Sequence, residues 1–151
     1  MAKQSAGLLM FRRRETGVEV LLAHPGGPLW KDKDVWGIPK GEYEPGEDPL
    51  EAACREFEEE TGFVAAGPYL GLGEITQRSG KRVRAWAFAG DCDAGAVVSN
   101  SFSMEWPPHS GIVIEVPELD RLAWFDPEAA RNAMNPAQAA LVDLLMEVLA
   151  A

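Results

Sequence analysis

Three closely spaced glutamates have the chemistry and the spacing to bind a divalent cation. Glu56, Glu59 and Glu60 follow an i, i+3, i+4 pattern, which places side chains on one face of an α-helix. Like charges at this spacing repel each other by roughly a few tenths of a kcal/mol per pair. A solvent-exposed acidic surface is the commonest reason for such a run, but it leaves the repulsion unexplained. Mg²⁺ and Mn²⁺ take oxygen ligands and would relieve it.

The residues around these glutamates predict the helix that would present them. Asp48 followed by Pro49, with Glu51 three positions after the aspartate, combines a capping carboxylate, a proline at the first helical position and a capping box. Gly62 stands where the helix would need a left-handed C-terminal cap. The apolar stripe expected to face the core consists of Leu50, Ala53, Cys54 and Phe57.

The remaining elements read mainly as strands. Two apolar runs, 6–11 and 18–24, are joined by a turn that contains Gly17, which predicts a β-hairpin. Residues 25–37 are rich in Gly, Pro, Asp and Lys and are expected to form a loop. A basic, period-two strand is expected within 81–90. Further strands are expected within 64–76, 111–116 and 122–125.

The C-terminal segment predicts a second helix. Asn135 precedes Pro136, and Gln138 lies three positions after the asparagine, so a cap, an N1 proline and a capping-box partner line up. An apolar face then recurs at helical spacing through Leu141, Leu144, Leu145 and Val148. Strands interleaved with two or three helices favour an α/β or α+β sandwich. We expect one domain, residues 1–151.

Composition restricts the class of partner. The formal net charge of the 151 residues is −10, which argues against a nucleic-acid polymer because phosphate backbones are bound through excess Lys and Arg. No apolar run approaches the roughly 20 residues that span a bilayer, and the first residues do not have the pattern of a secretory signal. Cys54 and Cys92 have no metal-site spacing. We expect a reduced, cytoplasmic protein without a membrane partner.

Residues 41–63 resemble the Nudix box, G-x5-E-x7-R-E-U-x-E-E-x-G-U, in which U is a bulky apolar residue. The match covers Gly41, Glu47, Arg55, Glu56, Phe57, Glu59, Glu60, Gly62 and Phe63. Phenylalanine at the first U is less usual in this family than Ile, Leu or Val. The resemblance implies an α/β/α sandwich with a mixed central sheet. It also implies an Mg²⁺- or Mn²⁺-dependent hydrolase of acid anhydrides, which cleaves a nucleoside diphosphate linked to another moiety.

The same resemblance assigns roles within the box. Glu59 and Glu60 would be the main metal ligands, and Glu56 would add a ligand or help to position water. The Gly41 carbonyl would join the metal ligands. Arg55 would orient the glutamates, which agrees with its place four residues before Glu59 on the predicted helix.

A further carboxylate often comes from outside the box in this family, as a base or as a metal ligand. Glu118, six residues before Trp124, stands where several Nudix enzymes carry such a glutamate. Glu115 is the second choice and Glu105 the third. A surface glutamate at the end of a strand is the alternative for each of them.

Residues 36–47 resemble the W-x-x-P-K-G-x-x-x-x-G-E run of diadenosine polyphosphate hydrolases and of their diphosphoinositol-polyphosphate relatives. In that comparison Lys40 would contact a phosphate, and Tyr43 or Trp36 would lie near the site. The first hypothesis for the substrate is therefore a dinucleoside polyphosphate such as diadenosine tetraphosphate. The alternatives are an NTP or dNTP pyrophosphohydrolase and, from another class, a non-catalytic module that senses nucleotides.

A negatively charged protein needs a local basic patch to hold a polyphosphate. Arg82 and Arg84 on the predicted strand, with Lys81 before them, are candidates, although an ordinary charged sheet face is the alternative. The long polar loop that follows His24 could form a substrate lid, and one of the five tryptophans could stack on adenine. We expect His24 itself to be structural, and the protein to be a monomer or homodimer.

Overall fold

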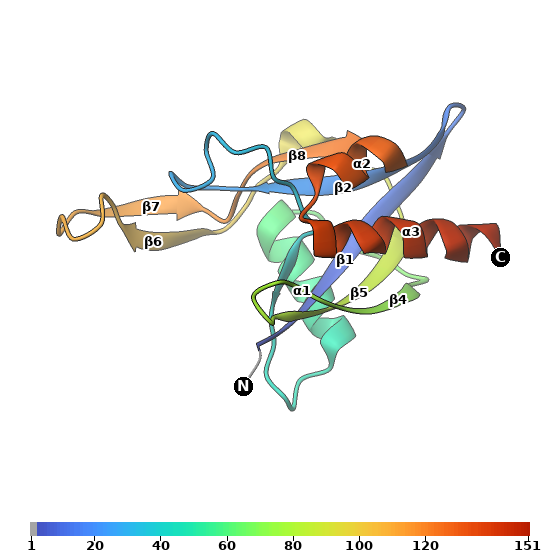
Figure 1. Ribbon diagram of the computed structural model, residues 1–151, viewed down its shortest axis with the longest axis horizontal. Helices are drawn as coiled ribbons and strands as arrows, with labels where there is room; N and C mark the ends of the chain where they lie inside the picture. Colours follow the sequence, from blue (N-terminus) through green and yellow to red (C-terminus); the bar gives the residue numbers. More distant parts are fainter. Residues whose placement is uncertain (1–2) are drawn as a thin grey trace.

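The computed structural model describes residues 3–151, and Figure 1 shows how their helices and strands are arranged. The strands are β1 (Gln4–Arg14), β2 (Gly17–Pro25), β3 (Lys40–Glu42), β4 (Leu70–Thr76), β5 (Arg82–Ala89), β6 (Ser101–Glu105), β7 (Val113–Pro117) and β8 (Leu119–Phe125). The helices are α1 (Pro49–Thr61), the 3-10 turn η1 (Ala94–Ala96), α2 (Pro127–Ala133) and α3 (Pro136–Ala150).

The central sheet is mixed, in the order β4-β5-β1-β2-β8. Strand β1 runs parallel to β5, whereas the pairs β1–β2, β2–β8 and β4–β5 are antiparallel. One edge of β1 is shared: residues 5–7 pair with β3, and residues 11–14 pair with β2. This division places the short β3, which contains the first residue of the Nudix-like segment, against the first half of β1.

Helices cover both faces of the sheet, so the expected sandwich is confirmed. Alternate residues of β1 face opposite layers: Leu8 packs toward α1, and Leu9 packs toward α2 and α3. In Figure 1, α1 lies behind the sheet and α3 in front of it. Burial of each large apolar side chain is worth about 1.5–3 kcal/mol. The two packed layers therefore hold the sheet and the three helices in a fixed relation.

Helix α1 begins and ends where the sequence predicts. The Asp48 carboxylate accepts a hydrogen bond from the Leu50 N–H at 3.4 Å, and Pro49 occupies the first turn. At the other end Gly62 has φ = 83°, and its N–H donates to the Glu58 carbonyl at 2.8 Å. A left-handed residue at this point favours glycine because a Cβ is disfavoured there. The helix that carries the acidic cluster is thus delimited by local chemistry.

The start of α3 is confirmed in part. The Asn135 side chain caps the helix by accepting from the Ala137 N–H at 3.0 Å. The capping-box role predicted for Gln138 is wrong, because its amide is used elsewhere. Its Oε1 accepts from the Ile38 N–H at 2.9 Å, and its Nε2 donates to the Gln77 Oε1 at 2.9 Å. Gln138 therefore ties α3 to the segment before β3 and to the turn after β4.

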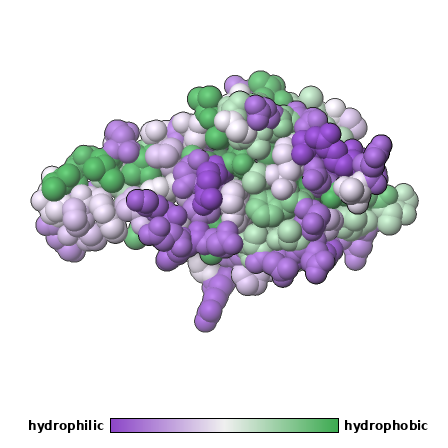
Figure 2. Space-filling model, turned by 90° about the horizontal axis from the view of Figure 1, so that it is seen from above, coloured by the Kyte–Doolittle hydropathy of each residue, from purple (hydrophilic) through white to green (hydrophobic). Residues whose placement is uncertain are grey.

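Four elements have no counterpart in the sequence-based expectations: β3, η1, β6 and α2. Strands β6 and β7 form a separate two-stranded sheet that projects from the body (Figure 1). Hydrophobic surface is visible on this hairpin in Figure 2. Its exposed hydrophobic residues include Phe102, Ile112 and Val113, with exposed fractions of 38%, 55% and 67%. Among residues 3–151, no helix is long and apolar enough to cross a membrane.

Candidate active site

A cavity of about 670 Å³ lies beside β3, between α1, the first turn of α3 and the loop that follows β2. Segments far apart in the chain form its walls. The charged residues that line it are Lys40, Glu42, Glu56, Glu60, Lys81 and Glu118. Ser5 also lines it, and the Ser5 Oγ is buried with no hydrogen-bond partner among the described residues. The cavity therefore offers carboxylates, ammonium groups and an unpaired hydroxyl to a polar ligand.

Close approach of β3 and α1 brings the Nudix-like residues together. Gly41 pairs with Ala6 of β1, and a Cβ built on Gly41 would overlap the Glu56 carboxyl group. Only glycine leaves that space free, which gives a physical reason for this residue at the first position of the box. The backbone of Gly41 and the Glu56 carboxylate are consequently neighbours.

Glu60 is the buried acid of the site, with only 8% of its surface exposed. Its Oε2 accepts a hydrogen bond from the backbone N–H of Lys40 at 3.2 Å. Burial, reinforced by the nearby charges of Glu56 and Glu118, raises its pKa to about 8. Burial also raises the pKa of Glu56, which additionally lies near Glu59 and Glu118. A cation bound beside these carboxylates would stabilise their ionised forms and so offset both the burial and the repulsion between neighbouring glutamates.

Arg55 bridges the acidic residues of the helix and of the preceding loop. Its guanidinium donates to the Glu47 carboxylate and to Glu56 Oε1, the latter at 3.4 Å, and its Nε lies 4.0 Å from Glu59 Oε1. These contacts raise the arginine pKa, Glu47 having the largest effect. The position agrees with the predicted orienting role, which stays a prediction.

The predicted metal ligands are not all gathered in one place. Gly41, Glu56 and Glu60 line the cavity, whereas Glu59 is absent from its lining and its side chain is 47% exposed. Within residues 3–151, no three His, Cys, Asp or Glu side chains form a ready-made metal cluster. The donor chemistry nevertheless fits a hard divalent cation, because the cavity holds carboxylate oxygens and a buried acid of raised pKa.

Of the three glutamates considered outside the box, only Glu118 lines the cavity. The other two belong to the projecting β6–β7 hairpin. Glu115 accepts a hydrogen bond from the Ser103 hydroxyl. Glu105 accepts from the backbone N–H groups of His109 and Gly111, at 2.8 and 3.2 Å, and so stabilises the hairpin turn.

The cations of the cavity are Lys40 and Lys81. The pKa of Lys40 is lowered mainly by burial and, to a smaller extent, by the positive charge of Lys81. Arg82 lines a separate hollow of about 480 Å³ together with Tyr43. Arg84 lines neither of these two cavities, and its guanidinium lies 5.9 Å from the centre of the Trp86 ring.

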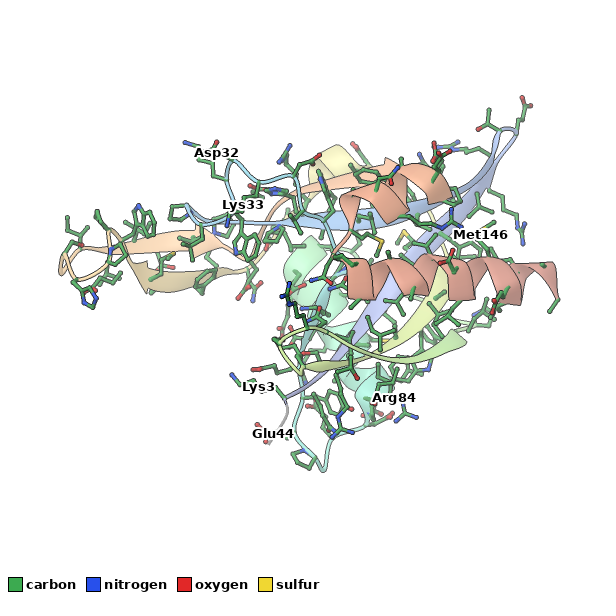
Figure 3. All side chains as sticks on the ribbon, in the orientation of Figure 1. Lys3, Asp32, Lys33, Glu44, Arg84 and Met146 are labelled. Atoms are coloured by element: carbon green, nitrogen blue, oxygen red, sulfur yellow. The ribbon has the colours of Figure 1, made fainter. Side chains whose placement is uncertain are left out.

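Figure 3 shows Arg84 on the side of the molecule that carries Glu44 and Lys3, far from Asp32 and Lys33 in the loop after β2. The structure thus gathers Lys40 and Trp36 at the main cavity and leaves the other predicted substrate contacts, Tyr43, Arg82 and Arg84, outside it.

His24 lies inside the protein and is fully buried. Its Nδ1 is 2.8 Å from Asp120 Oδ1, and its Nε2 is 2.5 Å from the Lys33 carbonyl oxygen. The ring also packs edge-on against Trp36, with a centroid distance of 5.2 Å. These contacts fix the end of the loop after β2, in agreement with the structural role expected for this histidine.

Sequence reasoning missed the glutamines of the cavity. Gln138 and Gln77 both line it, and Gln138 is only 5% exposed. A signal was present, since Gln138 occupies the first position of the helical stripe that continues through Leu141, Val142 and Leu145, all buried. A polar residue in a buried stripe usually has hydrogen-bond partners elsewhere.

Comparison with known proteins identifies the family. The NUDIX domain model matches residues 1–145. An RNA pyrophosphohydrolase from Rhizobium meliloti (strain 1021) is 34% identical over 105 residues, which cover 60% of this chain and 58% of that protein. A bis(5′-nucleosyl)-tetraphosphatase (asymmetrical) from Sus scrofa is 39% identical over 71 residues, which cover 43% of this chain and 46% of that protein. The chain thus spans about half the length of these curated relatives.

A solved structure shows the same fold along nearly the whole chain. The crystal structure of a C. elegans Ap4A hydrolase binary complex has a TM-score of 0.69 and 22% identity to this chain, and the match covers 97% of this chain and 98% of that one. The strand order and the helices on both faces of the sheet described above therefore have a counterpart in an experimental structure. With the family model matching residues 1–145, the chain belongs to the Nudix family.

Proposed function

We propose that the protein is a divalent-metal-dependent hydrolase that cleaves a pyrophosphate linkage in a nucleoside polyphosphate. The observation that carries this proposal is the meeting of Glu56, Glu60, Glu118 and Lys40 around one cavity. Pyrophosphate cleavage requires charge on the phosphate oxygens to be neutralised and a water molecule to be activated. Acidic residues for metal and water, with ammonium groups for phosphate, are the groups that this chemistry uses.

The residues divide into distinct roles. Glu56, Glu60 and the Gly41 carbonyl would hold the cation, with Glu59 as a further ligand. A bound cation would supply charge neutralisation on the phosphate and would lower the pKa of a water ligand. Arg55 positions Glu56 through its hydrogen bond.

The phosphate and the water would be handled by other side chains. Lys40 and Lys81 would bind the phosphate oxygens, because they are the ammonium groups that line the cavity. Glu118 would accept a proton from the attacking water, since it is the carboxylate in the lining that comes from outside the box.

We favour a dinucleoside polyphosphate of the diadenosine tetraphosphate kind as the substrate. Support comes from residues 36–47, whose pattern resembles that of the diadenosine polyphosphate hydrolases. The Sus scrofa relative, 39% identical over 71 residues, is a bis(5′-nucleosyl)-tetraphosphatase. Its matched region includes 46% of that protein.

Product analysis tests this choice. The purified protein, with Mg²⁺ or Mn²⁺, is incubated with diadenosine tetraphosphate, dNTPs, ADP-ribose and a diphosphoinositol phosphate, and the products are separated by ion-exchange chromatography. ATP plus AMP from the first compound supports the proposal, whereas pyrophosphate release from dNTPs favours a nucleotide pyrophosphohydrolase. Glu60→Gln should abolish turnover, and Glu58→Gln, an exposed change on the same helix, should not. Absence of metal-dependent turnover on every compound would refute the proposal and favour a non-catalytic sensor.

One finding favours a second candidate, the removal of pyrophosphate from the 5′ end of RNA. The Rhizobium meliloti relative is an RNA pyrophosphohydrolase, and its match covers 60% of this chain. The net charge of −10 opposes extended contact with an RNA backbone. A 5′-triphosphorylated oligoribonucleotide added to the panel decides the question. Faster release of pyrophosphate from this RNA than cleavage of diadenosine tetraphosphate would favour the second candidate.

A further inference from the structure

The cavity has an aromatic wall formed by two tryptophans, Trp30 and Trp36. Trp36 has little free surface, with an exposed fraction of 6%. The rings of His24 and Phe125 pack against it in T-shaped contacts, at centroid distances of 5.2 and 5.0 Å. The Arg121 guanidinium lies 5.2 Å from the centre of the Trp36 ring. The Trp36 ring is therefore covered by other protein groups, and its role is to pack the wall of the cavity.

Trp30 differs, because 39% of its surface is exposed although it lines the same cavity. Its backbone N–H donates to the Gly27 carbonyl at 3.2 Å, and its own carbonyl accepts from the Lys33 N–H at 3.0 Å. The Lys33 ammonium lies 5.2 Å from the centre of the indole ring. The tryptophan thus projects from a hydrogen-bonded turn and has free aromatic surface.

The loop that carries Trp30 is attached to the core on both sides of the tryptophan. The Lys33 carbonyl contacts the buried His24 ring at 2.5 Å, and His24 is in turn held by Asp120 at 2.8 Å. The start of the loop is also fixed, because the Gly26 N–H donates to the Glu118 carbonyl at 3.1 Å. An aromatic group whose loop is anchored on both sides of it loses less conformational freedom when a ligand stacks on it.

We propose that Trp30 stacks on the nucleobase of the substrate, and that the group bound next to the reacting phosphates is a nucleoside. The charges of the cavity favour this choice over a polyphosphorylated ring such as a diphosphoinositol. Among residues 3–151, the lining contains four carboxylates and two lysine side chains, too few cations for a ring that carries many phosphates. Base–aromatic stacking, in contrast, needs little charge and accepts every base.

The inference rests on the proposed function for the identity of the ligand, but its test does not require turnover. Ribose 5-phosphate has a hydroxyl group in place of the adenine base of AMP, and neither compound contains a pyrophosphate linkage. Their dissociation constants are measured by ¹H–¹⁵N NMR titration of the wild type, and the indole N–H signal of Trp30 is assigned from its loss in Trp30→Ala. We expect AMP to bind about 5- to 150-fold more tightly than ribose 5-phosphate, the range corresponding to one stacked base.

Three variants make the outcome decisive. Trp30→Ala should remove the preference for AMP, and Trp30→Phe should retain part of it because a smaller aromatic ring remains. Leu29→Ala is the matched control: Leu29 lies on the same loop, is 54% exposed and is not part of the cavity lining, so its variant should keep the full preference. Equal binding of AMP and ribose 5-phosphate to the wild type, or an unchanged preference in Trp30→Ala, would overturn the inference. Hydrolysis of diadenosine tetraphosphate would still stand in that case, so the two failures are distinguishable.

Discussion

The buried carboxylate of Glu60 should make the metal-free protein less stable as the pH rises. In the folded protein its pKa is about 8, compared with an ordinary value of 4.5. Between these two values the folded state keeps a proton that the unfolded chain releases. Linkage then requires the free energy of unfolding to fall as the pH increases through that interval. The substitution Glu60→Gln, which resembles the protonated acid, should remove this dependence.

The structure sets an upper limit to the effect. A difference of one pKa unit corresponds to about 1.4 kcal/mol, so the full interval would correspond to about 5 kcal/mol for a rigid site. Side-chain rotation and entry of water reduce this figure, because they restore solvation to the ionised group. We therefore expect Glu60→Gln to be more stable than the wild type at pH 9 by at least about 1 kcal/mol, or about 2–4 °C in Tm. At pH 5 the two proteins should be nearly equal.

The assay is thermal unfolding followed by circular dichroism, in EDTA, at pH 5, 7 and 9. Glu58→Gln serves as the control, since it changes an exposed glutamate of the same helix and should keep the pH dependence of the wild type. Added Mg²⁺ should raise the Tm of the wild type at pH 9, because the cation replaces the missing counter-charge, and should leave Glu60→Gln nearly unchanged. If the stability difference between Glu60→Gln and the wild type does not grow with pH, the account of Glu60 as a buried acid is wrong.

Three further predictions follow from the packing around the cavity. Gly41→Ala should lower kcat by on the order of tenfold or more, because the added Cβ would displace the Glu56 carboxyl group. A loss of about 1.4 kcal/mol in transition-state stabilisation is enough for a tenfold effect. An unchanged kcat would contradict the close approach of Gly41 and Glu56. Gln138→Leu should lower the free energy of unfolding by about 1–3 kcal/mol in urea titrations, because a buried backbone N–H loses its partner. Lys81→Ala should raise KM about fivefold, in line with an ion pair worth about 1 kcal/mol. Arg84→Ala changes a residue outside the cavity lining and should leave KM unchanged. A larger rise of KM in Arg84→Ala than in Lys81→Ala would show that the sheet face binds the phosphates.

Elements with strong local signals were predictable from the sequence. The capping aspartate and the terminal glycine of α1 act on backbone groups within a few residues, so their effect does not depend on the rest of the fold. The hairpin of β1 and β2, with Gly17 at φ = 128°, follows from two apolar runs and a turn. The alternation along β5 likewise agrees with the burial of Val83, Ala85 and Ala87, but not with that of Phe88, which is buried in the layer on the other face of the sheet.

Other features had weak local signals. Strand β3 has three residues and forms because β1 offers it an unpaired edge, which no pattern within residues 40–42 reveals. The capping-box interpretation of Gln138 failed for a related reason, since the local motif competes with a buried backbone N–H contributed by a loop 100 residues away. Hydrogen-bond partners this distant are set by packing rather than by spacing along the chain.

The sequence by itself determined the family signature, the limits of the acidic helix and the set of carboxylates available for chemistry. The tertiary structure decided how these carboxylates differ: Glu60 is buried beside the Lys40 N–H, whereas Glu59, one residue earlier, stays half exposed. It also decided that Lys81 and Glu118 face the same cavity. The physical reason is that burial and electrostatic environment depend on segments brought together by the sheet, whereas helix caps depend only on neighbours in the chain.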